Sequence, residues 1–151
     1  MIVVFYWSDF VVPLNNESYK YPVSIKGVIL HQEKVLLLKN DRDEWELPGG
    51  KLELNEEPMD CLVREVFEEV GIKVKVKGII DSWIYTIYDD LHVLIITYGC
   101  YEVKNDFYRI SNEHSAGKWF SLKELEDLRI LQGYLNSIKN WYRKLNLYGQ
   151  H

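Results

Sequence analysis

Acidic side chains gather in one stretch of the chain, residues 50–72. This stretch holds seven acidic and two basic residues, a sum of −5, whereas the rest of the 151-residue chain has 16 of each. The formal net charge of −5 therefore resides in this stretch. A balanced chain with one acidic cluster favours a cation site over a nucleic-acid surface, because phosphate backbones are bound by basic patches. A solvated acidic helix face is the alternative.

Three of these acids lie close together if residues 58–70 form a helix. At about 100° per residue, Glu65, Glu68 and Glu69 fan over roughly 100° of the helix surface. Like charges at this spacing repel each other by roughly a few tenths of a kcal/mol per pair, and a divalent cation among the oxygens relieves that repulsion. Arg64 flanks the three acids and can pair with Glu68. Hard oxygen ligands suit Mg²⁺ or Mn²⁺, so the spacing indicates metal-assisted attack on a phosphate, with a salt-bridged surface helix as the alternative.

The flanks of the acidic stretch resemble the signature of the Nudix hydrolase family. That signature is a Gly, a Glu after five residues, Arg-Glu after seven more, an aliphatic residue, any residue, Glu-Glu, any residue, Gly and an aliphatic residue. Gly50, Glu56 and residues 64–72 match it at every defined position. The segment before it, residues 45–50, and the segment from Glu113 to the Leu122 region also look like the family, so the resemblance covers about residues 23–128.

The resemblance implies a fold and an activity. The fold is α/β, a Nudix-like α/β/α sandwich around a mixed β-sheet in a single domain. The activity is that of a metal-dependent nucleoside diphosphate-X pyrophosphohydrolase, which cleaves a phosphoanhydride bond in a small nucleotide. Such substrates are nucleoside triphosphates, nucleotide sugars or dinucleoside polyphosphates. Two alternatives stay open: a non-catalytic nucleotide-sensing Nudix module, which usually lacks a motif glutamate, and an RNA-end or cap hydrolase, which would need a basic track.

Roles for individual residues also follow from the resemblance. Mg²⁺ or Mn²⁺ would be bound by three carboxylates and one backbone carbonyl, those of Glu65, Glu68, Glu69 and Gly49. Catalysis would involve Glu65, the supporting ion pair of Arg64 with Glu56, and the downstream acid Glu113. Which carboxylate is the general base stays open. Four side chains outside these positions are candidates for substrate binding: Lys39, Arg42, Lys51 and Tyr88.

The apolar pattern predicts the elements that position the motif. Short apolar runs at residues 23–30 and 34–38 flank a polar turn and predict a strand pair. Pro48-Gly49-Gly50 is a strong chain breaker, and Pro58 and Gly71 bound the motif helix. The apolar side of that helix, opposite the glutamates, comprises Met59, Val63, Val66, Phe67 and Val70. Three further strands are predicted at residues 74–80, 82–88 and 92–103.

The C-terminal part of the chain is predicted to be helical. Ser121 is a candidate N-cap for a helix over residues 122–128, with Glu124 at the capping-box position. An apolar stripe, formed by Leu135, Ile138, Tyr142 and Leu145, then predicts a last helix. The single Nudix domain is thus divided into an N-terminal edge segment (1–22), a core (23–128) and a C-terminal helix (129–151).

Composition limits the setting and the partners. Two cysteines without metal spacing indicate no disulfide framework, which favours a reducing, cytoplasmic location. No apolar run reaches membrane-spanning length. The expected partner is a small-molecule nucleotide substrate, with no stable nucleic-acid complex and no membrane. A homodimer is a further expectation, because residues 1–12 are unusually apolar. They either pack on the chain's own sheet as an edge strand or cover a partner.

Overall fold

The computed structural model describes residues 4–7, 10–13, 20–89, 91–103 and 116–148. A mixed sheet runs in the order β5-β4-β3-β8-β7, with β6 paired to β3 and β9 paired to β4. Strands β3 and β8 are parallel, and the other pairs are antiparallel. The elements, in chain order, are β1 (Val4–Trp7), β2 (Phe10–Pro13), β3 (Val23–His31), β4 (Lys34–Lys39), β5 (Trp45–Glu46), β6 (Gly49–Lys51), α1 (Pro58–Val70), β7 (Lys73–Tyr88), β8 (Leu91–Val103), β9 (Ala116–Ser121), the 3₁₀ helix η1 (Glu124–Asp127) and α2 (Gln132–Tyr148).

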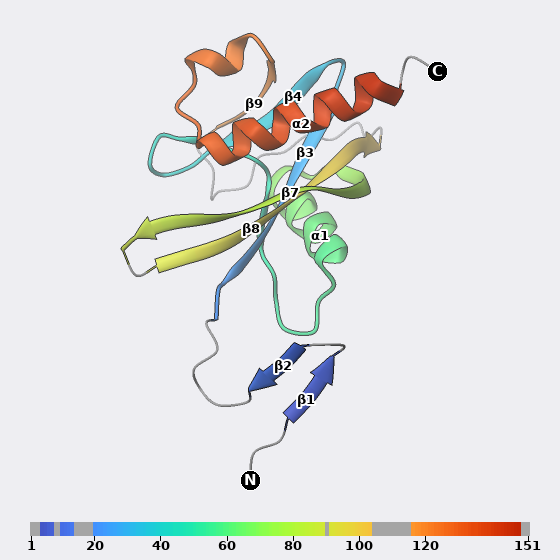
Figure 1. The fold of residues 1–151 in the computed structure, drawn as a ribbon. Helices are drawn as coiled ribbons and strands as arrows, with labels where there is room; N and C mark the ends of the chain where they lie inside the picture. The colour runs from blue at the N-terminus through green and yellow to red at the C-terminus, as the bar shows by residue number, and fades with distance from the viewer. Residues whose placement is uncertain (1–3, 8–9, 14–19, 90, 104–115, 149–151) are drawn as a thin grey trace.

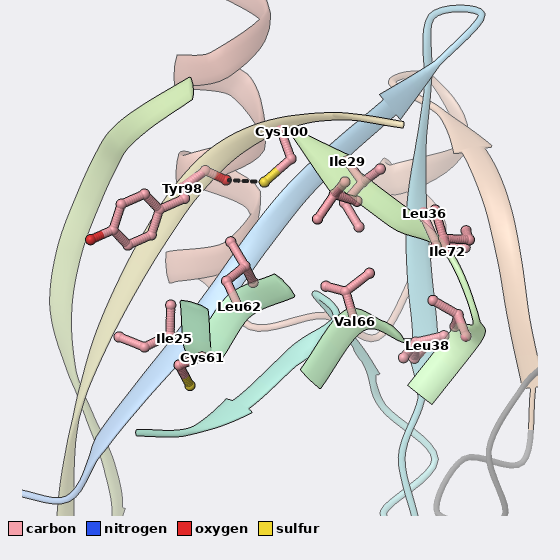
Figure 2. Packing of buried hydrophobic residues seen from close by; sticks show 12 residues of the cluster. Ile25, Ile29, Leu36, Leu38, Cys61, Leu62, Val66, Ile72, Tyr98 and Cys100 are labelled. Atoms are coloured by element: carbon pink, nitrogen blue, oxygen red, sulfur yellow. Dashed lines mark hydrogen bonds between the residues drawn. The ribbon is translucent and has the colours of Figure 1, made fainter. Parts of the chain in front are cut away.

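Helices α1 and α2 cover opposite faces of this sheet (Figure 1). Side chains alternate along a strand, so Leu36 and Leu38 of β4 pack in the cluster with α1, whereas Val35 and Leu37 pack in the cluster with α2. Figure 2 shows the first cluster, in which Leu62 and Val66 of α1 lie among side chains of β3, β4 and β8. The predicted α/β/α sandwich around a mixed sheet is therefore confirmed.

The motif helix buries a different side from the apolar one predicted. Cys61, Leu62, Val66, Glu69 and Val70 are buried. Three residues of the predicted apolar side face solvent instead, namely Met59, Val63 and Phe67, which are 39–51% exposed. The buried side is thus rotated toward the glutamates, because β3 and β6 cover the helix from that direction. The same rotation buries one of the three acids.

The predicted break at Pro48-Gly49-Gly50 is confirmed in part. Strand β5 ends at Glu46 and Pro48 lies outside any strand, but Gly49 and Gly50 already belong to the short strand β6, which pairs with β3. Gly49 has a φ of +128°, a conformation that side-chain-bearing residues rarely adopt. A Cβ on Gly49 would also lie 2.1 Å from the carbonyl oxygen of Ile25, so the two backbones approach too closely for any side chain. Glycine therefore lets the motif loop run directly against β3.

Other local expectations differ in detail. The two strands predicted at residues 74–80 and 82–88 are one 16-residue strand, β7, whose register with β8 shifts at Val76/Gly78, Ile79/Asp81 and Thr86/Tyr88. The helix predicted at residues 122–128 is only the 3₁₀ turn η1, whose N-cap is Lys123 rather than Ser121. Glu124 nevertheless accepts hydrogen bonds from both the amide and the hydroxyl of Ser121, at 2.8 Å each.

The N-terminal strands β1 and β2 form a two-stranded sheet of their own. They do not extend the seven-stranded sheet, so the expectation of an edge strand on the chain's own core is wrong for the described residues. The C-terminal helix is present as α2, and it packs Tyr134, Ile138 and Trp141 against the sheet. None of the helices in the described ranges is long and apolar enough to cross a membrane.

Candidate active site

Arg64 is the centre of an ion-pair network at the motif. Its Nε and Nη2 donate to the two carboxylate oxygens of Glu56 at 2.7 and 3.0 Å, a bidentate pair. Its Nη1 donates to Glu65 at 2.9 Å and to Glu68 at 3.3 Å. The hydrogen bonds from Arg64 lower the pKa of Glu56 to about 2, and those from Glu56 raise the pKa of Arg64. Both groups therefore stay charged at physiological pH, and the guanidinium holds two motif acids side by side.

The other side of the motif is built against β6. Glu69 is buried, and its Oε2 accepts a hydrogen bond from the Gly49 amide at 2.8 Å. The Glu65 carboxylate lies over Gly50, where a Cβ would be only 2.4 Å from its Cδ. Gly50 thus leaves room for the Glu65 carboxylate, whereas the Gly49 amide binds that of Glu69. Because α1 supplies the acids and β6 the backbone groups, the site depends on the packing of these two elements.

A buried lysine contacts the same part of the motif loop. Lys26 of β3 is only 6% exposed, and its Nζ donates to the Gly49 carbonyl oxygen at 2.8 Å. The Glu46 carboxylate lies 3.8 Å from the same Nζ. Burial lowers the pKa of Lys26, but Tyr134 and the acids Glu46, Glu69 and Glu65 outweigh it, so that the net pKa is raised. Lys26 is therefore a fixed positive charge beside the motif acids.

The donors present suit a hard divalent cation. Glu65 and Glu68 both lie within hydrogen-bond distance of one guanidinium nitrogen, so their oxygens can share a single cation. Carboxylate oxygens are the ligands that Mg²⁺ and Mn²⁺ prefer. Within the described ranges, however, no three acidic, histidine or cysteine side chains already converge on one metal position. To share one ion, the three acids would thus have to come closer together. The Gly49 carbonyl is already held by Lys26.

The candidate substrate-binding residues are spread over several elements. Lys39 pairs with Asp43 at 2.6 Å, and Arg42 pairs with Glu44 at 3.2 Å. Lys51 is an exposed residue at the end of β6, next to the motif. Tyr88 is 70% exposed at the end of β7, on the hairpin that Figure 1 shows extending away from α1. The structure thus brings Lys51 to the motif and does not bring Tyr88 there. The remaining acid, Glu113, lies outside the described residues.

Sequence reasoning did not single out Lys26 or its neighbour Tyr134. A signal for Lys26 was present, since it is the only charged residue in the run of residues 23–30. A charge inside a buried strand requires a partner, and the partners come from β5, β6 and α1, all distant in sequence. Tyr134 lies at the start of α2, where the apolar pattern resembles ordinary core packing.

Comparisons with known proteins agree with this architecture. A family model described as NUDIX domain matches residues 20–142. A MutT-like protein of Streptomyces ambofaciens is 32% identical over 109 residues, which are 71% of this chain and 68% of that protein. Diphosphoinositol polyphosphate phosphohydrolase 2 of Mus musculus is 31% identical over 121 residues, 77% of this chain and 64% of that protein.

Solved structures show the same fold. The crystal structure of a MutT protein from Methanosarcina mazei superposes with a TM-score of 0.71 at 25% identity, covering 83% of this chain and 95% of that one. The family model spans most of the chain and includes the motif helix, β6 and the strands that position them. The chain therefore belongs to the NUDIX family.

Proposed function

We propose that this chain is a metal-dependent hydrolase that cleaves a phosphoanhydride bond in a small nucleotide, namely a nucleoside diphosphate linked to another group. The observation that carries the proposal is the arrangement around Arg64, where one guanidinium holds Glu56, Glu65 and Glu68 together. A solvated surface helix would not need this bidentate pair or a buried acid such as Glu69. Family membership supports the same activity.

Mg²⁺ or Mn²⁺ would be held by the carboxylates of Glu65, Glu68 and Glu69. Bound there, the ion would neutralise phosphate charge and lower the pKa of an attacking water. The protein's own part is to orient these ligands. Arg64 and Glu56 fix the side-chain directions of Glu65 and Glu68, while the Gly49 amide fixes Glu69. A motif carboxylate or Glu113 would then accept the proton of the water.

Two features of the chain support a small, anionic substrate, and a third supports an enzyme. The chain outside the motif has equal numbers of acids and bases, a balance that does not favour binding along a phosphate backbone. Lys51 is exposed beside the motif and is placed to meet a phosphate. All motif glutamates are present, which supports an enzyme over a nucleotide-sensing module. The name of the mouse relative adds diphosphoinositol polyphosphates to the substrates that should be tried.

A substrate panel tests this function. The purified chain is incubated with nucleoside triphosphates, nucleotide sugars, dinucleoside polyphosphates, capped RNA and a diphosphoinositol polyphosphate, with Mg²⁺ or Mn²⁺, and products are separated by ion-exchange chromatography. We expect a nucleoside monophosphate from at least one small nucleotide. Turnover should disappear with chelator and in Glu68→Gln, whereas Glu126→Gln, which removes an exposed acid of η1, should retain it. Failure to cleave any nucleotide, or turnover unaffected by chelator, contradicts the proposal.

A further inference from the structure

Lys26 occupies a position that a hydrolase site with carboxylate ligands does not require. It is an ammonium group in the middle of β3, only 6% exposed, and it donates to the Gly49 carbonyl at 2.8 Å. Burying a charge is costly unless it is paired, so its place in the fold must be stabilised by its surroundings. Those surroundings are the motif loop and the acids of the motif.

Apart from Tyr134 of α2, each charged neighbour of this ammonium belongs to the candidate site or borders it. Glu46 lies 3.8 Å away, and Glu65 and Glu69 lie near enough to raise its pKa. Glu69 also accepts a hydrogen bond from the amide of Gly49, the same residue whose carbonyl binds Lys26. The amide and the carbonyl of one glycine are therefore held by a carboxylate and by an ammonium, respectively.

This geometry bears on how the site binds metal. A carbonyl oxygen has two lone pairs, so a hydrogen bond alone would leave room for a second partner. Charge is the stronger constraint. A doubly charged ion on the Gly49 carbonyl would stand beside a singly charged ammonium in a poorly solvated place, and Coulomb repulsion is strong there.

We propose that the Lys26 ammonium serves as a built-in cation of the site: it binds the Gly49 carbonyl and neutralises part of the negative charge of the acids. Divalent ions are thereby confined to the carboxylates. The carbonyl that the family resemblance suggests as a ligand is then not a ligand in this chain. The inference rests on the proposed function, since it concerns the number and place of the metal ions. Lys26 is a positioning residue, because it acts through the loop and the acids.

Metal titration provides the test. Free Mn²⁺ is measured by electron paramagnetic resonance during titration of the wild-type chain, Lys26→Met and Lys75→Met. The last variant is the matched control, because it removes the same charge from an exposed position of β7. Lys26→Met should bind one additional Mn²⁺ per chain, or hold the same number at least about tenfold more tightly, because a like charge is gone. Lys75→Met should match wild type.

The outcomes separate this inference from the proposed function. If Lys26→Met and wild type bind Mn²⁺ with equal number and affinity, the inference is wrong and the hydrolase proposal stands. If no variant binds Mn²⁺, both are wrong. A second measurement needs no variant: in protein labelled with ¹⁵N-lysine, a buried, hydrogen-bonded ammonium exchanges slowly and gives a distinct signal. That signal should persist when Mg²⁺ saturates the site. If the Lys26 signal instead moves to the position of exposed lysines when Mg²⁺ is added, the proposal is wrong, even if Lys26→Met does not fold.

Discussion

Replacing Gly50 by alanine should separate the chemistry of the site from the stability of the fold. The new methyl group would lie 2.4 Å from Cδ and 2.5 and 2.7 Å from the carboxylate oxygens of Glu65. Carbon atoms in contact lie about 3.5 Å apart or more, so the carboxylate must move by about 1 Å. Gly50 does not have a positive φ, so its backbone tolerates the substitution. The strain therefore falls on the end of one flexible side chain.

The size of the effect follows from this displacement. A misplacement of about 1 Å in a catalytic group can lower activity about a hundredfold. The cost in stability should be small, less than about 1 kcal/mol, because what is disturbed is a partly exposed ion pair with Arg64. Gly50→Ala should thus lower kcat/KM on the substrate found in the panel by about two orders of magnitude while the Tm stays within a few degrees of wild type.

Gly49→Ala serves as the comparison, because it should affect the stability of the fold. Its Cβ would meet backbone rather than a movable side chain, at 2.1 Å from the Ile25 carbonyl and 2.9 Å from the Cα of Lys26, at a φ of +128°. This variant should lose at least about 2 kcal/mol of unfolding free energy. Steady-state kinetics and calorimetry on both variants provide the assay. A Gly50→Ala protein with wild-type kcat/KM and wild-type Tm would refute the placement of Glu65 against Gly50.

Other perturbations test the remaining contacts. Glu68→Gln should reduce kcat by about two orders of magnitude and leave the Tm unchanged, because the Glu68 side chain is 59% exposed. Glu69→Gln should reduce both kcat and Tm, because Glu69 is buried. Steady-state kinetics and calorimetry distinguish the two variants. Arg64→Lys cannot keep the bidentate pair with Glu56, so kcat should fall about tenfold, and near-normal kcat would remove its orienting role. Folding lowers the pKa of Glu56 from 4.5 to about 2, so the ionised carboxylate stabilises the folded state fully only above about pH 4.5. The unfolding free energy measured in urea titrations should therefore decline as the pH falls from about 4.5 toward about 2. Glu56→Gln should lack that part of the acid dependence, and an identical pH profile would contradict the assignment.

Much of the fold could be predicted because it depends on local pattern. Strands β3 and β4 follow from short apolar runs around a polar turn, and α1 lies between Pro58 and Gly71 as expected. The three glutamates are neighbours on α1 because residues three and four apart always share a helix face. The motif spacing predicted this arrangement without any knowledge of the sheet.

The contacts that give the site its shape could not be predicted, because they join distant segments. Helical periodicity shows which residues share a side, but not which side another element covers; hence Phe67 is exposed and Glu69 is buried. The strand β6 pairs its three residues with β3, a pairing that the composition of a Pro-Gly-Gly segment argues against. The partners of Lys26 lie on three other elements, β5, β6 and α1, all distant from it in sequence.

The length of β7 has a consequence for handling the protein. Within the described part of the chain, β7 pairs with β8 on one side and with no strand on the other, so its free edge can pair with another molecule. The first part of β7 carries exposed lysines at positions 73, 75 and 77. The part at residues 82–88 has no charged side chain and exposes Ile84 and Tyr88. Charged residues on an edge discourage intermolecular strand pairing. At high concentration the protein should therefore aggregate through residues 82–88 of β7. Ile84→Lys should reduce this aggregation without changing the motif residues.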